Sequence, residues 1–262
     1  ASYYDMAYMN YQDPERYFRK IKDDKEAKDA LGEFSRKTLK PERFVASILK
    51  DPKWLDEYNM NKDSIADFQQ VGANTLLYYT AQQVIDLPNT PLNLKLDDLL
   101  TLEELYQVYV MRNADSYFYA GWDNLSKNVL PYSQTNLLKN IIESANRHIA
   151  ENKGGATLRF GHDSNVLPLC SLMNIDGAGV HVDNIDEIAE NWAMYWYIPK
   201  AANLQFVFYR SEKKNAPVLV KVLLNEHEAT LPVPTDNFPY YKWSDFVEVY
   251  DNSLKDSPAN NL

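Results

Sequence analysis

The chain has 262 residues, with 27 Lys and Arg against 37 Asp and Glu, and its formal net charge is −10. An acidic chain without clustered Lys and Arg lacks the surface that holds a phosphodiester backbone, which argues against nucleic-acid binding. Hydrophobic residues make up 45% of the chain, enough for a substantial core. No apolar stretch approaches the roughly twenty residues that a membrane helix needs. The single cysteine, Cys170, excludes an internal disulfide and a cysteine-based zinc site.

Helical signals dominate the first half of the chain. Residues 23–29 carry mixed acidic and basic side chains, a pattern typical of a solvated helix face. We expect a helix over residues 64–85, with Ser64 as its N-cap. Thr101 and Glu104 have the spacing of a capping box, which predicts a helix that starts there and continues through Arg112.

A further helix is predicted by an apolar stripe with a period of 3.6 residues. The stripe consists of Leu138, Ile141, Ile142, Ala145 and Ile149. The sequence Lys153-Gly154-Gly155 follows it, and glycine commonly ends helices.

The pattern changes after these glycines. Residues 156–160 are short, β-prone and bounded by glycines, so they predict a buried strand. Aromatic and β-branched residues predict further strands over 192–197, 204–209 and 218–224. The last element is an amphipathic helix built on Trp243, Phe246, Val247 and Tyr250, followed by a tail expected to be disordered.

This order of elements indicates an α/β fold in which a helical region accompanies an α/β core. We divide the chain into a mainly helical cap region over residues 1–135, the C-terminal part of the core over 136–250, and a flexible tail over 251–262.

Polar and titratable residues are concentrated between the predicted strand and the apolar segment after it. They are Gly161, His162, Asp163, Ser164 and Asn165. Ligand sites of α/β proteins collect at strand ends, and a helix that starts near Asn165 would offer free N–H groups to an anion. Gly161 would allow close approach of a ligand. His162 can donate hydrogen bonds to a phosphate oxygen, and Asp163 can protonate a departing alcohol oxygen.

A His-Asp pair has a structural interpretation as well, as a hydrogen-bonded loop that caps the following helix. The wider string Phe160-Gly161-His162-Asp163-Ser164-Asn165 is more specific. It resembles the C-terminal His-Asp motif of the histidine acid phosphatases, in the branch with phytases and multiple inositol polyphosphate phosphatases. Residues 218–226, followed by Thr230-Leu231-Pro232, also look like the terminal strands of the inositol-polyphosphate members.

The resemblance implies phosphomonoester hydrolysis in two steps, without a cofactor. In that family the histidine of an Arg-His-Gly motif attacks phosphorus, and water then hydrolyses the phosphohistidine. By the resemblance, His162 would bind the phosphoryl group and Asp163 would protonate the leaving oxygen. Gly161, Ser164 and Asn165 would support the loop.

The chain departs from the family pattern in two respects. None of its four histidines lies in an Arg-His-Gly sequence, and the arginine cluster that accompanies that motif is absent too. We therefore expect the chain to be the C-terminal portion of an incomplete core, inactive alone, with the nucleophile on a missing N-terminal segment of the same protein. Inositol-polyphosphate members often carry His-Ala-Glu where this chain has His162-Asp163-Ser164, which leaves phytate as one possible substrate.

The remaining candidate residues point to structure. His148 lies at the polar edge of its predicted helix. His227, between Glu226 and Glu228, does not have the spaced ligands of a zinc site, and we assign no metal. Cys170 follows the motif within an apolar segment, where a small core residue is expected.

The alternative is a non-catalytic module, either a degenerate phosphatase relative or a ligand-binding domain that uses its aromatic surface. The partners expected under the first interpretation are a small phosphorylated substrate and the missing segment, with neither nucleic acid nor membrane. Family habit suggests a periplasmic or secreted protein.

Overall fold

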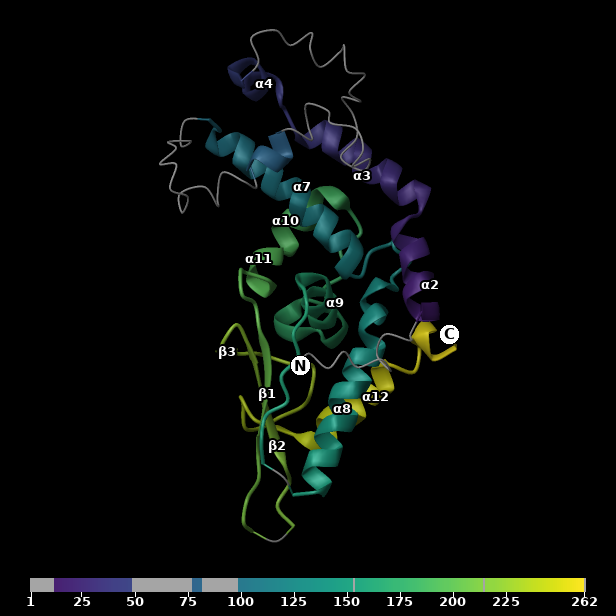
Figure 1. Cartoon of the computed structure of the whole chain (residues 1–262), viewed down its shortest axis with the longest axis vertical. Helices are drawn as coiled ribbons and strands as arrows, with labels where there is room; N and C mark the ends of the chain where they lie inside the picture. The colour runs from purple at the N-terminus through teal and green to yellow at the C-terminus, as the bar shows by residue number, and fades with distance from the viewer. Residues whose placement is uncertain (1–11, 49–76, 82–98, 153, 214, 262) are drawn as a thin grey trace, which may run out of the picture. The chain divides into compact units, whose positions relative to one another are not determined.

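The computed structural model describes residues 12–48, 77–81, 99–152, 154–213 and 215–261 (Figure 1). The chain folds into two compact units. Unit 1 comprises residues 1–22, 116–183 and 190–262, and unit 2 comprises residues 23–115 and 184–189. Residue 135, where we placed a domain boundary, lies within unit 1. The roles of helical cap and catalytic core remain predictions.

Unit 1 contains an antiparallel sheet arranged around one strand. This strand, β2 (Leu219–Leu224), pairs with β1 (Leu204–Tyr209) along its whole length, from Leu204 opposite Leu224 to Tyr209 opposite Leu219. It also pairs with β3 (His227–Glu228) and β4 (Tyr241–Lys242). Helices and strands thus combine in one unit, and the predicted α/β class is confirmed. The strands expected over 204–209 and 218–224 are also confirmed.

The sheet packs against α12 (Trp243–Ser253), which lies beside it in Figure 1. Burial alternates along β2, where Val220 and Val222 are fully buried, as period-two geometry requires. On α12 the buried residues Trp243, Phe246 and Tyr250 recur at helical spacing. Phe206 contacts Phe246 and Phe208 contacts Trp243, with ring centroids 6.0 and 4.9 Å apart. The predicted terminal amphipathic helix is therefore confirmed.

The segment after α12 is ordered, so the expectation of a disordered tail is wrong. Leu254 and Ser257 are 2% and 1% exposed, and a 3-10 helix, η5, covers Pro258–Asn261. The hydroxyl oxygens of Thr135 and Ser257 lie 2.7 Å apart. Burial of one leucine and this hydrogen bond hold a segment whose composition alone looked like a solvated terminus.

The remaining long helices of unit 1 are α2 (Gln12–Lys22), α8 (Thr135–Ala150) and α9 (Asp163–Met173). The 3-10 helix η2 (Leu130–Gln134) leads directly into α8. Leu138 and Ile142 of α8 are buried, which confirms the predicted apolar stripe.

Two predicted strands are absent. Residues 156–160 form neither strand nor helix, and Leu158 and Phe160 are 76% and 94% exposed. A β-prone segment becomes a strand only when another strand pairs with its backbone, and none of the described residues does so. Residues 192–197 include the short helix α11 (Met194–Tyr197), which follows α10 (Ile188–Asn191).

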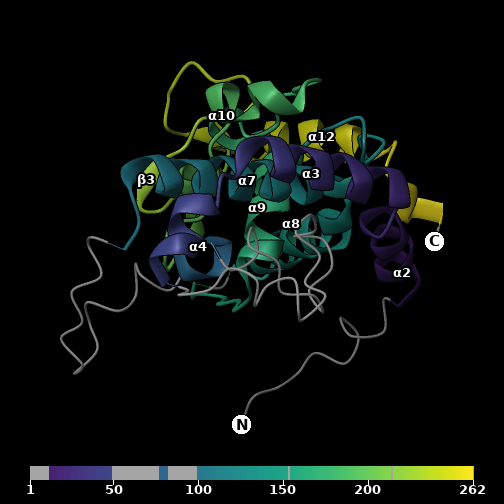
Figure 2. The same cartoon turned by 90° about the horizontal axis from the view of Figure 1, so that it is seen from above.

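The described part of unit 2 is helical. It contains α3 (Lys25–Thr38), α4 (Glu42–Ile48), most of α7 (Leu102–Ala120) and the 3-10 helix η4 (Ile185–Glu187), and Figure 2 shows α3, α4 and α7 from above. Residues 77–81 are also helical, whereas Ser64 and most of the helix predicted from it lie outside the described residues. The predicted solvated face is confirmed, because Lys25 and Lys28 make exposed ion pairs with Asp29 and Asp23.

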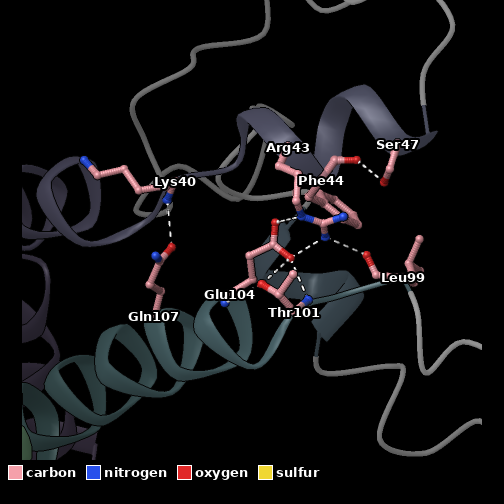
Figure 3. A network of polar contacts seen from close by, with 8 residues as sticks. All are labelled: Lys40, Arg43, Phe44, Ser47, Leu99, Thr101, Glu104 and Gln107. Atoms are coloured by element: carbon pink, nitrogen blue, oxygen red, sulfur yellow. Dashed lines mark hydrogen bonds and ion pairs between the residues drawn. The ribbon is translucent and has the colours of Figure 1, made fainter.

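A polar network joins α4 to the start of α7 (Figure 3). Thr101 N donates to Glu104 Oε2 over 2.8 Å and Glu104 N donates to Thr101 Oγ1 over 3.2 Å, which confirms the capping box. Arg43 donates to both carboxylate oxygens of Glu104, with 2.8 Å from Nε to Oε1, and to the carbonyl oxygen of Leu99. Glu104 is 4% exposed, so its charge is balanced by hydrogen bonds rather than by water.

Candidate active site

The predicted site residues lie together at the N-terminal end of α9. His162 is the N-cap, with extended backbone at φ −115° and ψ 166°, and Asp163 is the first helical residue. The helix therefore starts two residues before the predicted position near Asn165. In Figure 1, α9 lies next to α11, which it contacts within unit 1.

Local hydrogen bonds set the start of α9. The carbonyl oxygen of His162 accepts from the N–H groups of Asn165 at 3.0 Å and Val166 at 3.2 Å. Asp163 Oδ1 accepts from the N–H of Ser164 at 2.8 Å. Asp163 therefore satisfies one first-turn donor, and a negative charge at this end of a helix is favoured by the helix dipole.

The side chains that we assigned to chemistry are open to solvent. Gly161, His162, Asp163 and Ser164 are exposed, and Asn165 is half-buried. Within the described part of the chain, the Asp163 carboxylate makes no ion pair, and its only hydrogen bond is the one from Ser164. A proton donor needs this access to a leaving oxygen.

Two details of the predicted setting differ. The segment before the site is exposed and irregular, so the site does not follow a buried strand among the described residues. A Cβ added at Gly161 would lie 3.6 Å from Asn165 Oδ1, an ordinary contact, and glycine is not required there by the space available. The role of Gly161 in ligand approach remains a prediction.

The body of α9 is buried. Leu167, Leu169 and Met173 are at most 4% exposed. Pro168 lies inside the helix and has no N–H, so the carbonyl of Ser164 lacks its usual helical partner. Cys170 is fully buried, as expected for a core residue, and burial raises the pKa of its thiol to about 12, with a smaller contribution from the charge of Asp176.

Side chains distant in sequence hold the C-terminal end of α9. The indole N–H of Trp122 donates to the carbonyl oxygen of Ser171 over 3.1 Å, and the Tyr250 hydroxyl donates to that of Met173 over 2.8 Å. The bond from Tyr250 satisfies a carbonyl that the helix end leaves without a helical partner, whereas the carbonyl oxygen of Ser171 also accepts from Asn174 N at 3.1 Å. Sequence reasoning missed both residues, because separations of 49 and 77 positions leave no local pattern.

The loop after α9 is fastened to the segment after β3. Asp176 Oδ1 accepts from the N–H and the hydroxyl of Thr230, at 2.7 and 2.8 Å. In return Asp176 N donates to the carbonyl oxygen of Thr230 over 3.0 Å. The helix that begins with Asp163 is thus connected at its far end to the sheet of unit 1.

The other histidines lie elsewhere. His148 is in the last turn of α8, and His227 is exposed in β3. His181 Nε2 lies 2.8 Å from Asp183 Oδ1, and this contact, with a hydrogen bond from Asn124, lowers the pKa of Asp183. Within the described ranges, no three His, Cys, Asp or Glu side chains form a group that could hold a metal ion, and no helix could cross a membrane.

Comparison with known families identifies the superfamily of the chain. The model of the histidine phosphatase superfamily (branch 2) matches residues 4–225. The chain belongs to this superfamily, as its His-Asp motif indicated. Comparison with curated protein sequences gives no match.

Among solved structures, the chain is similar to the multiple inositol polyphosphate phosphatase of Bifidobacterium longum. Its complex with inositol hexasulfate shares 15% identity at a TM-score of 0.66, over 88% of this chain and 56% of that chain. The phosphate complex shares 14% identity at a TM-score of 0.60, over 93% of this chain and 56% of that chain. The apo form shares 16% identity at a TM-score of 0.56, over 87% of this chain and 53% of that chain. These matches show a shared fold, and the chain spans little more than half the length of the neighbours.

Proposed function

We propose that this chain is part of a phosphomonoester hydrolase of the histidine type, with Asp163 as proton donor and His162 as phosphate ligand. The observation that carries the proposal is the pair's position. Both side chains are exposed, and they occupy the N-cap and first residue of α9, where the helix dipole favours an oxyanion.

In the proposed first step a histidine nitrogen forms a bond to phosphorus while the bond from phosphorus to the ester oxygen breaks. The Asp163 proton passes to that oxygen, so an alcohol leaves instead of an alkoxide. Water then attacks the phosphohistidine, giving inorganic phosphate and free histidine, and Asp163 recovers its proton. The imidazole of His162 donates hydrogen bonds to the phosphoryl oxygens in both steps.

The attacking histidine is proposed to lie outside these residues. No Arg-His-Gly sequence occurs in the chain. Of the chain's other histidines, His181 is engaged in a contact with Asp183. We therefore propose that the 262-residue chain alone does not turn over substrate, and that Ser164 and Asn165 support the loop.

Inositol phosphates are the substrate class that we propose. The similar Bifidobacterium protein is a multiple inositol polyphosphate phosphatase, and its structures include complexes with inositol hexasulfate and with phosphate. The sequence His162-Asp163-Ser164 leaves simpler phosphomonoesters as the competing class. Secretion or export to a periplasm is part of the same proposal.

The test compares the polypeptide encoded by the complete reading frame with the 262-residue chain. Each is incubated with inositol hexakisphosphate and with p-nitrophenyl phosphate at acidic pH, and released phosphate is measured. We expect turnover by the complete polypeptide only, with an acid-labile phosphohistidine trapped on rapid quenching. Phosphate binding without turnover by the complete polypeptide would instead support the non-catalytic alternative.

A further inference from the structure

The segment that leads into the candidate site is tied to unit 1 by one arginine. Residues 154–161 make no backbone hydrogen bond with any residue that the structure describes. Of these residues, Arg159 alone has a side chain that hydrogen-bonds to the described part of the chain, and it donates from Nη2 to Asn140 Oδ1 of α8 over 2.8 Å. The bond holds the segment three residues before His162.

Asn140 lies on a firmly held part of α8. Leu138 and Ile142, on either side of it in the sequence, are 0% and 5% exposed, so this turn of the helix packs into the core of unit 1. Further along α8, Asn146 Oδ1 accepts from the indole N–H of Trp243 over 2.7 Å, which ties the helix to α12. A side chain bonded to Asn140 is thus held relative to elements that core packing fixes.

The imidazole of His162 depends on its backbone for its position. It is exposed, and it makes no hydrogen bond with the residues that the structure describes. The carbonyl side of His162 is held by the N–H groups of Asn165 and Val166, at 3.0 and 3.2 Å. Within the described ranges, the amino side is held through the preceding segment alone. Three residues of backbone span at most about 11 Å, so a movement at Arg159 reaches the imidazole.

We infer that Arg159 and Asn140 are positioning residues for His162. The inference rests on one part of the proposed function, the binding of phosphate by the His162 imidazole. The hydrogen bond between Arg159 and Asn140 holds the segment against α8 and so sets the direction from which the imidazole meets a phosphate oxygen. Without this bond the imidazole must be ordered when phosphate binds, and that ordering weakens binding.

The expected effect differs from that of losing the acid. Asp163 is the first residue of α9 and is held by the helix itself, so a loosened segment should not impair proton donation. In the proposed mechanism His162 contacts the phosphoryl group and not the departing alcohol. Loss of the Arg159 bond should therefore raise KM by the same factor for esters with good and poor leaving groups, with kcat unchanged.

A direct role of the Arg159 charge in phosphate binding is the competing explanation. Substitution of Asn140 separates the two, because it removes the acceptor and leaves the arginine in place. Asn140 is exposed on α8, and leucine is a good helix former, so Asn140→Leu should keep the fold. Asn140→Asp keeps an acceptor oxygen and should restore the bond.

Calorimetric titration of the complete polypeptide with inorganic phosphate tests the inference, because it needs no turnover. We expect Arg159→Met and Asn140→Leu each to raise the Kd for phosphate by about threefold to tenfold, the effect of one lost hydrogen bond, and Asn140→Asp to stay within about twofold of the parent. The matched control is Arg147→Met, at an exposed arginine of α8, which should leave the Kd unchanged. In kinetic assays, KM should rise by the same factor on an alkyl phosphate and on p-nitrophenyl phosphate.

An unchanged Kd for Asn140→Leu would overturn the inference, and a weakened Arg159→Met beside it would assign the arginine to phosphate directly. Failure of Asn140→Asp to restore binding, or a loss confined to the alkyl ester, would overturn it as well. If Asn140→Leu does not fold, Asn140→Ala removes the same acceptor. The expected Kd values without turnover of either ester would reject the hydrolase and leave the positioning role intact, whereas a parent that does not bind phosphate would reject both.

Discussion

The hydroxyl of Tyr250 in α12 donates a hydrogen bond of 2.8 Å to the carbonyl oxygen of Met173, the last residue of α9. Asp163 is the first residue of the same helix, ten residues before Met173 and about 15 Å from it along the helix axis. One end of α9 is thus held by the helix that packs on the sheet, while the other presents the candidate acid to solvent. A firmly held helix positions its first residue reproducibly, which a proton donor requires.

The first prediction concerns this hydrogen bond. Tyr250→Phe keeps the ring in place and leaves the buried carbonyl of Met173 without its donor, so the free energy of unfolding should fall by about 1–3 kcal/mol. Chemical denaturation followed by tryptophan fluorescence measures the change. Tyr106→Phe, at a residue 58% exposed, is the control and should change stability by less than about 0.5 kcal/mol. Equal effects of the two substitutions would show that the Tyr250 bond contributes nothing specific.

The second prediction concerns the pH dependence of unit 2. Burial raises the pKa of Glu104, but hydrogen bonds from Arg43 and Thr101 outweigh it and hold the pKa below its ordinary value of 4.5. A carboxyl group whose pKa is lower in the folded than in the unfolded state stabilises the fold at pH values above its unfolded pKa. This stabilisation is lost as the pH falls through the folded pKa. The free energy of unfolding should therefore decrease as pH falls below about 4.5.

Glu104→Gln tests this assignment. The variant should be less stable than the parent by about 1–3 kcal/mol at pH 7, because Arg43 loses its charged partner, and the difference should shrink toward pH 3. Denaturation at a series of pH values measures both. Glu143→Gln, at an exposed position of α8, should retain the parent's pH dependence. A constant difference between Glu104→Gln and the parent at all pH values would contradict the account.

The third prediction concerns Cys170. Its thiol is fully buried and burial raises its pKa to about 12, so neither access nor ionisation favours reaction. The native chain should react with a thiol reagent at pH 8 only at the rate of unfolding, and added denaturant should expose one thiol per chain. Rapid stoichiometric labelling in native buffer would show that α9 opens readily.

Elements with a complete local signal were predictable from sequence. The apolar stripe of α8 includes the buried Leu138 and Ile142, and the Thr101 and Glu104 spacing gave the reciprocal hydrogen bonds of a capping box. The strands β1 and β2 were also predictable, because β-branched and aromatic residues occur on both sides of a polar turn. In each case the interacting residues are close in sequence.

Elements decided by distant contacts were not predictable. The aromatic run over 192–197 indicated a strand, yet Asn225 donates from its side chain to the carbonyl oxygens of Trp196 and Tyr197 and supports the end of α11. Residues 156–160 have strand composition but no strand partner among the described residues. Propensity describes what a segment can form, and the partner decides whether it does.

The candidate site also combines a part that was predictable from local sequence with a part that was not. The motif from Gly161 to Asn165 was recognisable as a string, and the structure brings its members together because they are consecutive at one helix start. Trp122 and Tyr250, which hold the other end of that helix, left no signal. Tertiary hydrogen bonds from single aromatic residues have no sequence period.

The proton-donor role of Asp163 is tested most directly by measuring how the loss of turnover on its substitution depends on the leaving group. The complete polypeptide and its Asp163→Asn variant are compared on an alkyl phosphate and on p-nitrophenyl phosphate, with Asp251→Asn, exposed in α12, as control. We predict a loss in kcat of about 10²- to 10⁴-fold on the alkyl ester and a much smaller loss on p-nitrophenyl phosphate, because nitrophenolate leaves without a proton. Equal losses on both esters, or unchanged turnover, would contradict the role of Asp163.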